Sequence, residues 1–387
     1  MKILYLLNYT LPLGGATKSF LILLDRIIGK GFCPIVVVPN KDGIYELIKQ
    51  KGINIICVPF RDATYPWTRN IRDLILFLPR LFGRIWLNWK AVKKLQKELE
   101  NEEIDIIHSN VSVIDIGYRL SRQLHIPHIY HIREFGDLDF AMHYYPSKRH
   151  FQKLLNSTES YSVCITKAIQ RHHKQSSNPN SVVIYNGIHN AIDSICDIEK
   201  KKKRYFLFAG RIEPSKGVDD LLEAYSKYHG TVPLYLAGYY NVNSDYFKKI
   251  KAILANNDLS DRVHLLGGRD DIEELMRNAL ALIVPSHFEA FGRSMAEAMF
   301  NNCLVIGHDT EGTKEQFDNG RALIGKEIGL RYSSVEELTN RLMEAEVMES
   351  AHYKEYTHNA LHTVNSLYST EVFIENICHF YHRIHTR

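Results

Sequence analysis

The chain has 387 residues, of which 45% are hydrophobic and 24% are charged. This balance is that of a soluble globular protein that can bury a sizeable core. Because single cores stop growing at about 250–300 residues, the length predicts two domains. The net charge of +4 gives no case for nucleic-acid binding, so we expect no nucleic-acid partner.

The cysteines and the N-terminus indicate where the chain is found. The six cysteines include no CxxC pair and no dense framework, which indicates a reducing, cytoplasmic compartment; they are Cys33, Cys57, Cys164, Cys196, Cys303 and Cys378. The first apolar run soon reaches polar residues and Pro12, so it is too short for a signal peptide or a membrane span. We interpret that run as the first buried strand.

Short apolar runs rich in β-branched residues alternate with amphipathic segments of helical length. This alternation is typical of parallel βαβ units with both sheet faces covered. The first series of candidate strands is residues 2–8, 34–39, 53–59, 105–110, 128–132, 161–166 and 182–186. The second series is residues 205–210, 233–238, 262–267, 280–286 and 304–309.

The two series predict an α/β protein with two Rossmann-like, doubly wound parallel-sheet domains that face each other across a cleft. We place the first domain at residues 1–190 and the second at residues 200–369. Residues 187–204, which end in the charge run Lys200–Arg204, are predicted to form the linker. Residues 370–387 have a helical period and are expected to pack back on the first domain. A ligand is expected in the cleft, at the carboxyl ends of the strands.

The segment AGRIEPSKG, residues 209–217, lies between a predicted strand and a helix that begins near Val218. Arg211 and Lys216 could converge there on one anion, beside helix N–H groups. A diphosphate suits the pair, because Arg offers a planar fork to two oxygens and Lys a compact charge. Taken alone, the segment is equally compatible with a surface loop that carries two solvated cations.

The segment EAFGRSMAE, residues 289–297, follows the strand at 280–286. Glu289 falls in the loop and Glu297 in the next helix, and each carboxylate could accept hydrogen bonds from two hydroxyls of a sugar or a ribose. Gly292 at the helix start lets backbone N–H groups approach a ligand closely. Two glutamates eight residues apart also occur in many helices without a ligand.

Two strand ends of the first domain carry further candidates. Gly14 and Gly15 open a helix that could hold a phosphate, or they form only a tight turn; GxGxxG and P-loop patterns are absent. His131 at the end of the strand at 128–132, and Arg133 and Glu134 directly after it, are expected to face the cleft. A histidine there suits hydrogen bonding to a sugar hydroxyl or phosphate and proton transfer, or it is an ordinary strand-end residue.

Taken in order, the GG loop, His131, VIYNGI at 183–188, GRIEPSKG and EAFGRSMAE resemble the family 4 retaining glycosyltransferases with the GT-B fold. The resemblance runs from Gly14 to about Glu315. It implies that the anomeric configuration is retained, by front-face attack in which a phosphate oxygen takes the acceptor proton. No protein nucleophile, metal or other cofactor is expected. By analogy with an oxyanion-hole donor, losing one cationic contact to the leaving diphosphate should cost about 2–4 kcal/mol.

The resemblance also assigns roles to residues. Arg211 and Lys216 match the cations that neutralise the diphosphate, Glu289 the glutamate near the transferred sugar, and Glu297 the glutamate that holds the ribose. Together with His131, which matches the histidine that helps to position the sugar, Arg211, Lys216 and Glu289 form the predicted catalytic set. The predicted donor-binding residues are Gly14, Gly15, Arg211, Lys216, Arg269, Glu289, Ala290, Phe291, Gly292, Ser294 and Glu297. The predicted acceptor-side residues are Asn110, Arg133 and Glu134.

The chain departs from the family pattern in two places. Asn301 and Asn302 replace a glycine turn, and because Asn tolerates left-handed geometry we expect the turn to survive. EGTKE at 311–315 differs from the family's GGxxE at its first position, so no donor contact is assigned to Glu311 or Gly312. A DxD at Asp137 and Asp139 is not expected to bind metal, because it competes with a complete cationic site.

Residues 61–97 hold nine Lys or Arg against two Asp, together with all three tryptophans. This composition suits helices that lie in an anionic membrane interface near a lipid-linked acceptor. Helices packed on the sheet with a solvated basic face are the alternative. Pro79, Arg80 and Arg84 interrupt the apolar run, so a membrane span is not expected.

The sequence therefore predicts a hexosyltransferase that uses a nucleotide diphosphate sugar, with UDP favoured over GDP. It would transfer a hexose or N-acetylhexosamine to a saccharide acceptor, lipid-linked, in surface polysaccharide assembly. The expected location is cytoplasmic, peripheral on the inner face of the cell membrane. A nucleotide-sugar epimerase or hydrolase of the same fold, and a catalytically silent sugar-nucleotide-binding subunit, remain the alternatives.

Overall fold

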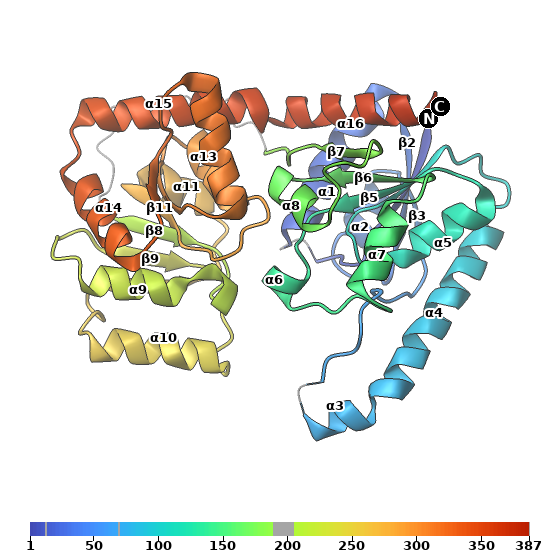
Figure 1. The fold of residues 1–387 in the computed structure, drawn as a ribbon, viewed down its shortest axis with the longest axis horizontal. Helices are drawn as coiled ribbons and strands as arrows, with labels where there is room; N and C mark the ends of the chain where they lie inside the picture. Colours follow the sequence, from blue (N-terminus) through green and yellow to red (C-terminus); the bar gives the residue numbers. More distant parts are fainter. Residues whose placement is uncertain (12–13, 69, 189–204, 387) are drawn as a thin grey trace. The chain divides into compact units, whose positions relative to one another are not determined.

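The computed structural model of the chain describes residues 1–11, 14–68, 70–188 and 205–386 (Figure 1). They divide into two compact units, which we call unit 1 (Met1–Gly187 with Thr370–Arg387) and unit 2 (Ile188–Ser369). Each unit contains one parallel sheet flanked by helices, which confirms the predicted α/β fold class. Apart from its first two residues, the predicted linker at 187–204 lies outside the described residues, as does the charge run Lys200–Arg204.

The sheet of unit 1 is parallel, in the order β3-β2-β1-β4-β5-β6-β7. Its strands are β1 (Lys2–Leu6), β2 (Cys33–Val38), β3 (Asn54–Cys57), β4 (Ile106–Ser109), β5 (His128–Ile132), β6 (Ser160–Cys164) and β7 (Ser181–Val183). All seven predicted strands of the first series are present. The last ends earlier than predicted, at Val183, and the chain beyond it leaves the sheet with Asn186 buried.

Helices cover both faces of this sheet (Figure 1). On one face, α1 (Gly15–Ile27) packs with the C-terminal helix α16 (Thr370–His385), which buries Phe373, Ile377 and Phe380 in the core. The other face contacts α5 (Asp115–Leu124) and α7 (Lys148–Leu155). The remaining helices are the short η1 (Ile28–Lys30), α2 (Tyr45–Gln50), α3 (Ile71–Ile75), α4 (Phe77–Glu98), α6 (Asp137–Phe140) and α8 (Lys167–His172).

Helix α4 is amphipathic and packs against α5 through one side only. Leu81, Val92 and Leu95 are buried on that side, and the Asn88 amide donates to the carboxylate of Asp115 at 2.9 Å. The first turns of α4 and all of α3 project away from the sheet (Figure 1). Among the described helices, none combines the length and the apolar character that crossing a membrane requires.

The sheet of unit 2 is also parallel, in the order β10-β9-β8-β11-β12-β13. Its strands are β8 (Phe206–Ala209), β9 (Leu234–Ala237), β10 (Val263–Gly267), β11 (Ala281–Val284), β12 (Leu304–His308) and β13 (Leu330–Tyr332). The last was not predicted, because three residues with Arg331 at their centre show no apolar run. The helices are η2 (Pro214–Lys216), α9 (Val218–Ser226), α10 (Asp245–Asn256), α11 (Ile272–Asn278), α12 (Arg293–Phe300), α13 (Glu311–Ile324), α14 (Val335–Val347) and α15 (Ser350–Leu367).

Each sheet reverses its strand order between two neighbouring strands, β1 and β4 in unit 1 and β8 and β11 in unit 2. In doubly wound sheets, ligands bind outside the carboxyl ends of the strands at such a switch point. The predicted site residues follow these same strands: Gly14, Gly15 and Asn110 in unit 1, and Arg211, Lys216 and Glu289 in unit 2.

The structure shows the backbone geometry at the two places in unit 2 where the sequence departs from the family pattern. Asn302 has a left-handed backbone, with φ of 51°, which confirms that asparagine substitutes for glycine in the turn before β12. Asn301, with φ of −88°, does not share that geometry. Glu311 also has a positive φ, of 42°, so it occupies a conformation that favours glycine.

Gly217 ties the two switch-point loops of unit 2 together. Its φ is 61°, and a Cβ added there would lie 2.1 Å from the carbonyl oxygen of Pro285, directly after β11. The His287 N–H also donates to the carbonyl of Ser215 at 3.1 Å. The loop after β8 and the loop after β11 are therefore in direct backbone contact.

We expect Gly217→Ala to destabilise unit 2 much more than Gly325→Ala. Gly325 also has a positive φ, of 79°, but a Cβ there would meet no atom within 4 Å. Gly325→Ala should therefore cost only the left-handed backbone penalty of about 1–2 kcal/mol, whereas Gly217→Ala adds the clash. Urea unfolding of both variants measures the difference, and equal losses would contradict the contact.

Candidate functional site

Lys216 and Glu289 meet at the switch point of unit 2. The Lys216 Nζ donates to the Glu289 Oε2 at 2.7 Å, although the two residues are 73 positions apart. Both side chains are only partly exposed, which strengthens the attraction between their charges relative to an open surface. The sequence predicted both residues as donor-site residues, and the structure brings them together.

The other predicted cations of unit 2 form local ion pairs. Arg211, after β8, donates from Nη1 to the Glu213 Oε1 at 3.0 Å, and both side chains are largely exposed. Arg269, after β10, donates from Nε to the Asp271 Oδ1 at 2.8 Å. Exposed pairs of this kind contribute about 0–1 kcal/mol, so each guanidinium can exchange its partner for a ligand at little cost.

Hydrogen bonds from α13 hold the loop from Glu289 to Gly292 in place. The Gly312 N–H donates to the Glu289 carbonyl at 2.8 Å, and the Gln316 Nε2 donates to the Gly292 carbonyl at 3.0 Å and to the Phe291 carbonyl. A Cβ at Gly312 would lie 2.5 Å from the Glu289 oxygen, so only glycine allows this approach. Gln316, which belongs to none of the predicted site motifs, thus fixes the loop that carries Glu289.

The predicted donor residues on α12 lie at its start. Gly292 precedes the helix with φ of 84°, and Ser294 lies in its first turn. Glu297, in the second turn, forms an ion pair with Arg293 at 2.8 Å. Phe291 is buried and its ring contacts Tyr368 edge-on, with centroids 5.4 Å apart, whereas Ala290 is partly exposed. Phe291 can therefore offer a ligand only its backbone.

In unit 1 the structure joins Asn110, His131 and Arg133 in one buried network. The Arg133 guanidinium donates to the Asn110 carbonyl at 3.1 Å, to the Asn110 Oδ1 at 3.2 Å and to the Asn186 Oδ1 at 2.5 Å. It also lies 3.2 Å from the His131 Nδ1. Asn186, in the VIYNGI segment, was not predicted as a site residue, and its amide oxygen accepts from the arginine.

Burial changes the expectation for this group. His131, Arg133 and Glu134 were expected to face a cleft, but they are only 0%, 7% and 5% exposed. His131 lies in β5, a strand covered on both faces, and Arg133 and Glu134 follow it directly, so their polar atoms find partners within unit 1. Direct contact of these side chains with a ligand stays a prediction.

Glu134 is held by Ser112, in the loop after β4. The Ser112 N–H donates to the Glu134 Oε1 at 2.9 Å, and the Ser112 hydroxyl donates to the same oxygen. The Arg133 N–H donates to the Oε2 at 3.2 Å. Burial raises the pKa of Glu134 to about 7, against the effect of the Ser112 hydrogen bond, which lowers it. Glu134 therefore changes charge near neutral pH.

Gly14 and Gly15 start α1 at the switch point of unit 1. Gly14 precedes the helix in an extended conformation, and the Asn110 Nδ2 donates to the Ala16 carbonyl at 3.3 Å, which links the loops after β1 and β4. A Cβ at Gly15 would meet no atom of the described residues within 4 Å, whereas a Cβ at Gly14 would lie 3.3 Å from the Tyr9 ring. Among the described residues, the space beside Gly15 is therefore open, as an approaching ligand would need.

Neither acidic cluster is assigned a metal. The DxD aspartates have separate structural partners, since Asp137 pairs with Lys148 and Asp139 accepts from the Gly136 N–H at 2.7 Å. Among the described residues, the ligand atoms of Asp219, Asp220 and His287 come within 4.8 Å of one another. Asp219 already accepts hydrogen bonds from Tyr246 and Lys249, each at 2.7 Å.

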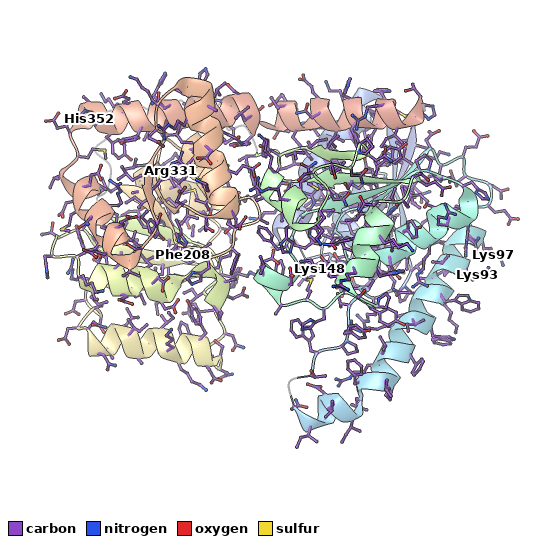
Figure 2. The ribbon with its side chains drawn as sticks, in the orientation of Figure 1. Lys93, Lys97, Lys148, Phe208, Arg331 and His352 are labelled. Carbon is purple, nitrogen blue, oxygen red and sulfur yellow. The ribbon has the colours of Figure 1, made fainter. Side chains whose placement is uncertain are left out.

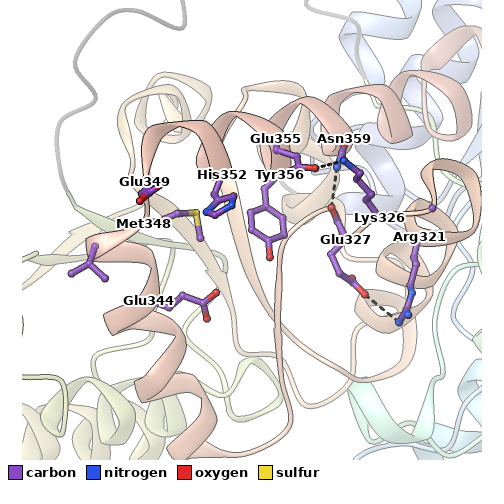
Figure 3. Close-up of a pocket in the computed structure, with 12 residues that line it drawn as sticks. Arg321, Lys326, Glu327, Glu344, Met348, Glu349, His352, Glu355, Tyr356 and Asn359 are labelled. Carbon is purple, nitrogen blue, oxygen red and sulfur yellow. Dashed lines mark hydrogen bonds and ion pairs between the residues drawn. The ribbon is translucent and has the colours of Figure 1, made fainter.

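Two surface pockets lie away from the predicted donor residues. One of about 760 Å³ opens in unit 2 beside α14 and α15, and its charged side chains include the pairs Lys326–Glu355 and Arg321–Glu327 (Figure 3). Another of about 390 Å³ lies in unit 1. Because no predicted donor residue lines either pocket, we assign them no part in donor binding.

Comparison with known proteins agrees with this architecture. Residues 13–191 match the family model described as Glycosyltransferase Family 4, and residues 196–360 match the one described as Glycosyl transferases group 1. An uncharacterized glycosyltransferase of Methanocaldococcus jannaschii is 29% identical over 298 residues, which cover 75% of this chain and 81% of that protein.

Solved structures show the same fold over the whole length. A glycosyltransferase from Rickettsia africae has a TM-score of 0.79 at 18% identity, covering 99% of this chain and 98% of that one. Anabaena HepE, in complex with UDP, has a TM-score of 0.76 at 22% identity, covering 98% of this chain and 99% of that one.

The two parallel-sheet units define a protein of the GT-B fold. Each half of the chain matches a glycosyltransferase family model, one of them family 4, and the relatives agree. Together these findings support a glycosyltransferase.

We expect Ser112→Ala to cost more stability at alkaline than at acidic pH. The pKa of Glu134 is raised from 4.5 to about 7 in the folded chain, so its ionisation lowers the free energy of unfolding as pH rises between these values. The Ser112 hydroxyl stabilises the ionised form, so its loss should cost about 1 kcal/mol near pH 5 and about 2 kcal/mol near pH 8.5. Urea unfolding at the two pH values measures this.

Ser162→Ala is the matched control. Ser162 is also fully buried, but its hydroxyl donates to the neutral Gln175 Oε1, at 3.3 Å. Its penalty should be the same at both pH values. A Ser112→Ala penalty that is equally independent of pH would show that Glu134 does not titrate in this range.

Proposed function

We propose that the chain is a retaining glycosyltransferase that moves a hexose or N-acetylhexosamine from a nucleotide diphosphate sugar to a saccharide acceptor. The observation that carries the proposal is the Lys216–Glu289 pair at the switch point of unit 2, where a cation for the diphosphate and a carboxylate for the sugar lie side by side. UDP is favoured over GDP, and the UDP bound to Anabaena HepE supports that choice.

The pair explains how a donor would reorganise the site. Without a donor, the Lys216 ammonium is neutralised by Glu289. A diphosphate brings two or more negative charges and competes for the ammonium, and the released carboxylate can then accept hydrogen bonds from sugar hydroxyls. The ion pair thus keeps both side chains in position until the donor binds. The diphosphate then pairs with Lys216, and the sugar hydroxyls donate to Glu289.

The remaining residues have supporting roles in this mechanism. Arg211 exchanges its exposed partner for a phosphate oxygen and, with Lys216, stabilises the charge that develops on the leaving diphosphate. Glu297 holds the ribose from α12. The anomeric configuration is retained by front-face attack, in which a phosphate oxygen takes the acceptor proton, with no protein nucleophile and no metal.

Incubation with labelled UDP- and GDP-sugars and a membrane lipid extract tests the activity, and we expect a glycosylated lipid product. Lys216→Ala should reduce kcat/KM by an amount equivalent to about 2–4 kcal/mol, because one cationic contact to the leaving group is lost. Lys227→Ala is the matched control, since Lys227 forms an exposed pair with Glu223 on α9.

Other products would identify the alternatives. Free sugar alone would indicate a hydrolase, an interconverted sugar nucleotide an epimerase, and binding without turnover a silent subunit. An unchanged kcat/KM for Lys216→Ala would contradict the assignment of the diphosphate site.

We further propose that α3 and α4 hold the enzyme against an anionic membrane, at the inner face of the cell membrane, where a lipid-linked acceptor would be found. The outer side of these helices carries large apolar side chains that are each more than half exposed: Ile71, Leu74, Ile75, Leu78, Phe82, Trp86 and Trp89. Those on α4, namely Leu78, Phe82, Trp86 and Trp89, recur every three or four residues, which places them on one face of that helix, other than the face that buries Val92 and Leu95.

Basic side chains accompany this apolar face. Lys93 and Lys97 point outward from α4 (Figure 2), and the Lys90 ammonium lies over the ring of Trp86, 3.7 Å from its centroid. Aromatic and aliphatic side chains can enter the headgroup region while lysines and arginines bind anionic lipid headgroups. Both features support a peripheral attachment to the membrane.

Flotation with phosphatidylglycerol vesicles tests the attachment. We expect the wild-type chain to float and the double variant Phe82→Ser, Trp86→Ser to float far less, because it lacks two of the three aromatic side chains of α4 that are more than half exposed. Val347→Ser is the control, since Val347 is 79% exposed on unit 2. A wild-type chain that does not bind anionic vesicles would rule out the attachment.

A further inference from the structure

A chain of hydrogen bonds crosses the interior of unit 1 and ends at His131. The Tyr5 hydroxyl lies 3.1 Å from the Tyr381 hydroxyl, which lies 2.7 Å from the His108 Nδ1. The His108 Nε2 lies 3.1 Å from the His131 Nδ1, and the Arg133 Nη2 lies 3.2 Å from the same nitrogen. This series of hydrogen bonds thus connects β1, α16, β4 and β5, and the two tyrosines and two histidines in it are at most 1% exposed.

Arginine fixes the direction of these bonds. A guanidinium has only donors, so the His131 Nδ1 next to Arg133 must carry a lone pair. The His108 Nε2 faces that lone pair and must therefore carry a proton. If the direction were reversed, a proton on the His131 Nδ1 would point at the Arg133 N–H, and two donors would oppose each other.

The directions of the other hydrogen bonds in the series follow from this assignment. A neutral His108 with its proton on Nε2 has a lone pair on Nδ1, which accepts from the Tyr381 hydroxyl, and Tyr381 in turn accepts from Tyr5. Burial, with the charge of Arg133 as the second cause, holds the pKa of His108 and of His131 well below the usual value. Neither imidazole therefore takes up a second proton near neutral pH.

We propose that Arg133 and His108 are positioning residues that hold His131 as the neutral tautomer with its proton on Nε2. The role of His131 toward a sugar rests on the proposed function. With its proton on Nε2, His131 would donate a hydrogen bond to a ligand and would not act as a general base. A neutral histidine with a proton on Nε2 has its lone pair on Nδ1, and that lone pair is occupied by Arg133 and His108.

The His131 Nε2, at the end of this series of hydrogen bonds, supports a ligand contact. Among the described residues, the His131 Nε2 is buried and has no hydrogen-bond partner. A buried N–H without an acceptor costs about 1–3 kcal/mol, so an arriving hydroxyl or phosphate oxygen would remove an existing penalty. The ligand class that fits this position is therefore one with an acceptor oxygen.

Histidine-selective nitrogen NMR on the unliganded full chain reads the tautomers directly. We expect His131 and His108 each to show a protonated Nε2 and an unprotonated Nδ1. Arg133→Met should give mixed tautomers at both histidines, because the group that fixes the direction is lost, whereas Arg133→Lys should keep the wild-type pattern. Tyr381→Phe should also leave His131 unchanged, since Arg133 and not the phenol sets its tautomer.

A wild-type His131 with its proton on Nδ1, or a doubly protonated His131, would overturn the inference even if the Arg133 variants fail to fold. A change of the His131 tautomer in Tyr381→Phe would also overturn the inference, because the hydrogen bonds would then be directed from His131 toward Tyr381.

Activity provides the second measurement. His131→Gln keeps an N–H donor near the position of Nε2, whereas His131→Glu offers only acceptors when ionised. We expect the Glu variant to lose about 10- to 100-fold more kcat/KM than the Gln variant, and the reverse order would indicate a base and overturn the inference. Absence of glycosyl transfer by the wild-type chain would count against the proposed function alone, because the tautomers are read without substrate.

Discussion

The contact between Lys216 and Glu289 exists because parallel strands all end at the same edge of a sheet. The two residues follow β8 and β11, which are neighbours in space although β9 and β10 lie between them in the chain. Gly217 allows the two loops to touch, and Gln316 holds the second loop from α13. Each of these supports lies outside the segment that carries Glu289, so the site depends on the whole sheet and not on one motif.

The two units handle charge in opposite ways. In unit 2, the predicted donor-site cations Arg211, Lys216 and Arg269 lie at the surface or partly buried, in ion pairs that a ligand can replace. Unit 1 buries Arg133 among Asn110, Asn186 and His131, and burial there lowers the pKa of His131. Charges that can change partners suit a diphosphate, whereas donors with a fixed direction suit uncharged hydroxyls.

Helix α4 shows why composition alone left two interpretations open. The nine basic residues and three tryptophans of residues 61–97 fit helices packed on the sheet as well as helices in an interface. In the structure, Leu81, Val92 and Leu95 are buried, and Phe82, Trp86 and Trp89 are each more than half exposed. Which apolar residues face outward depends on where α5 lies, and the sequence of α4 does not contain that information.

The sequence by itself determined the alternation of strands and helices and the loops that carry Arg211, Lys216 and Glu289, because apolar period and turn residues are local properties. It also indicated the left-handed turn at Asn302. Only the tertiary structure decided that β13 joins the sheet, that Gln316 and Ser112 support the site residues, and that His131 is buried beside His108 and Tyr381. These outcomes depend on contacts between residues far apart in the chain, and hydrogen-bond direction and burial are set by such contacts.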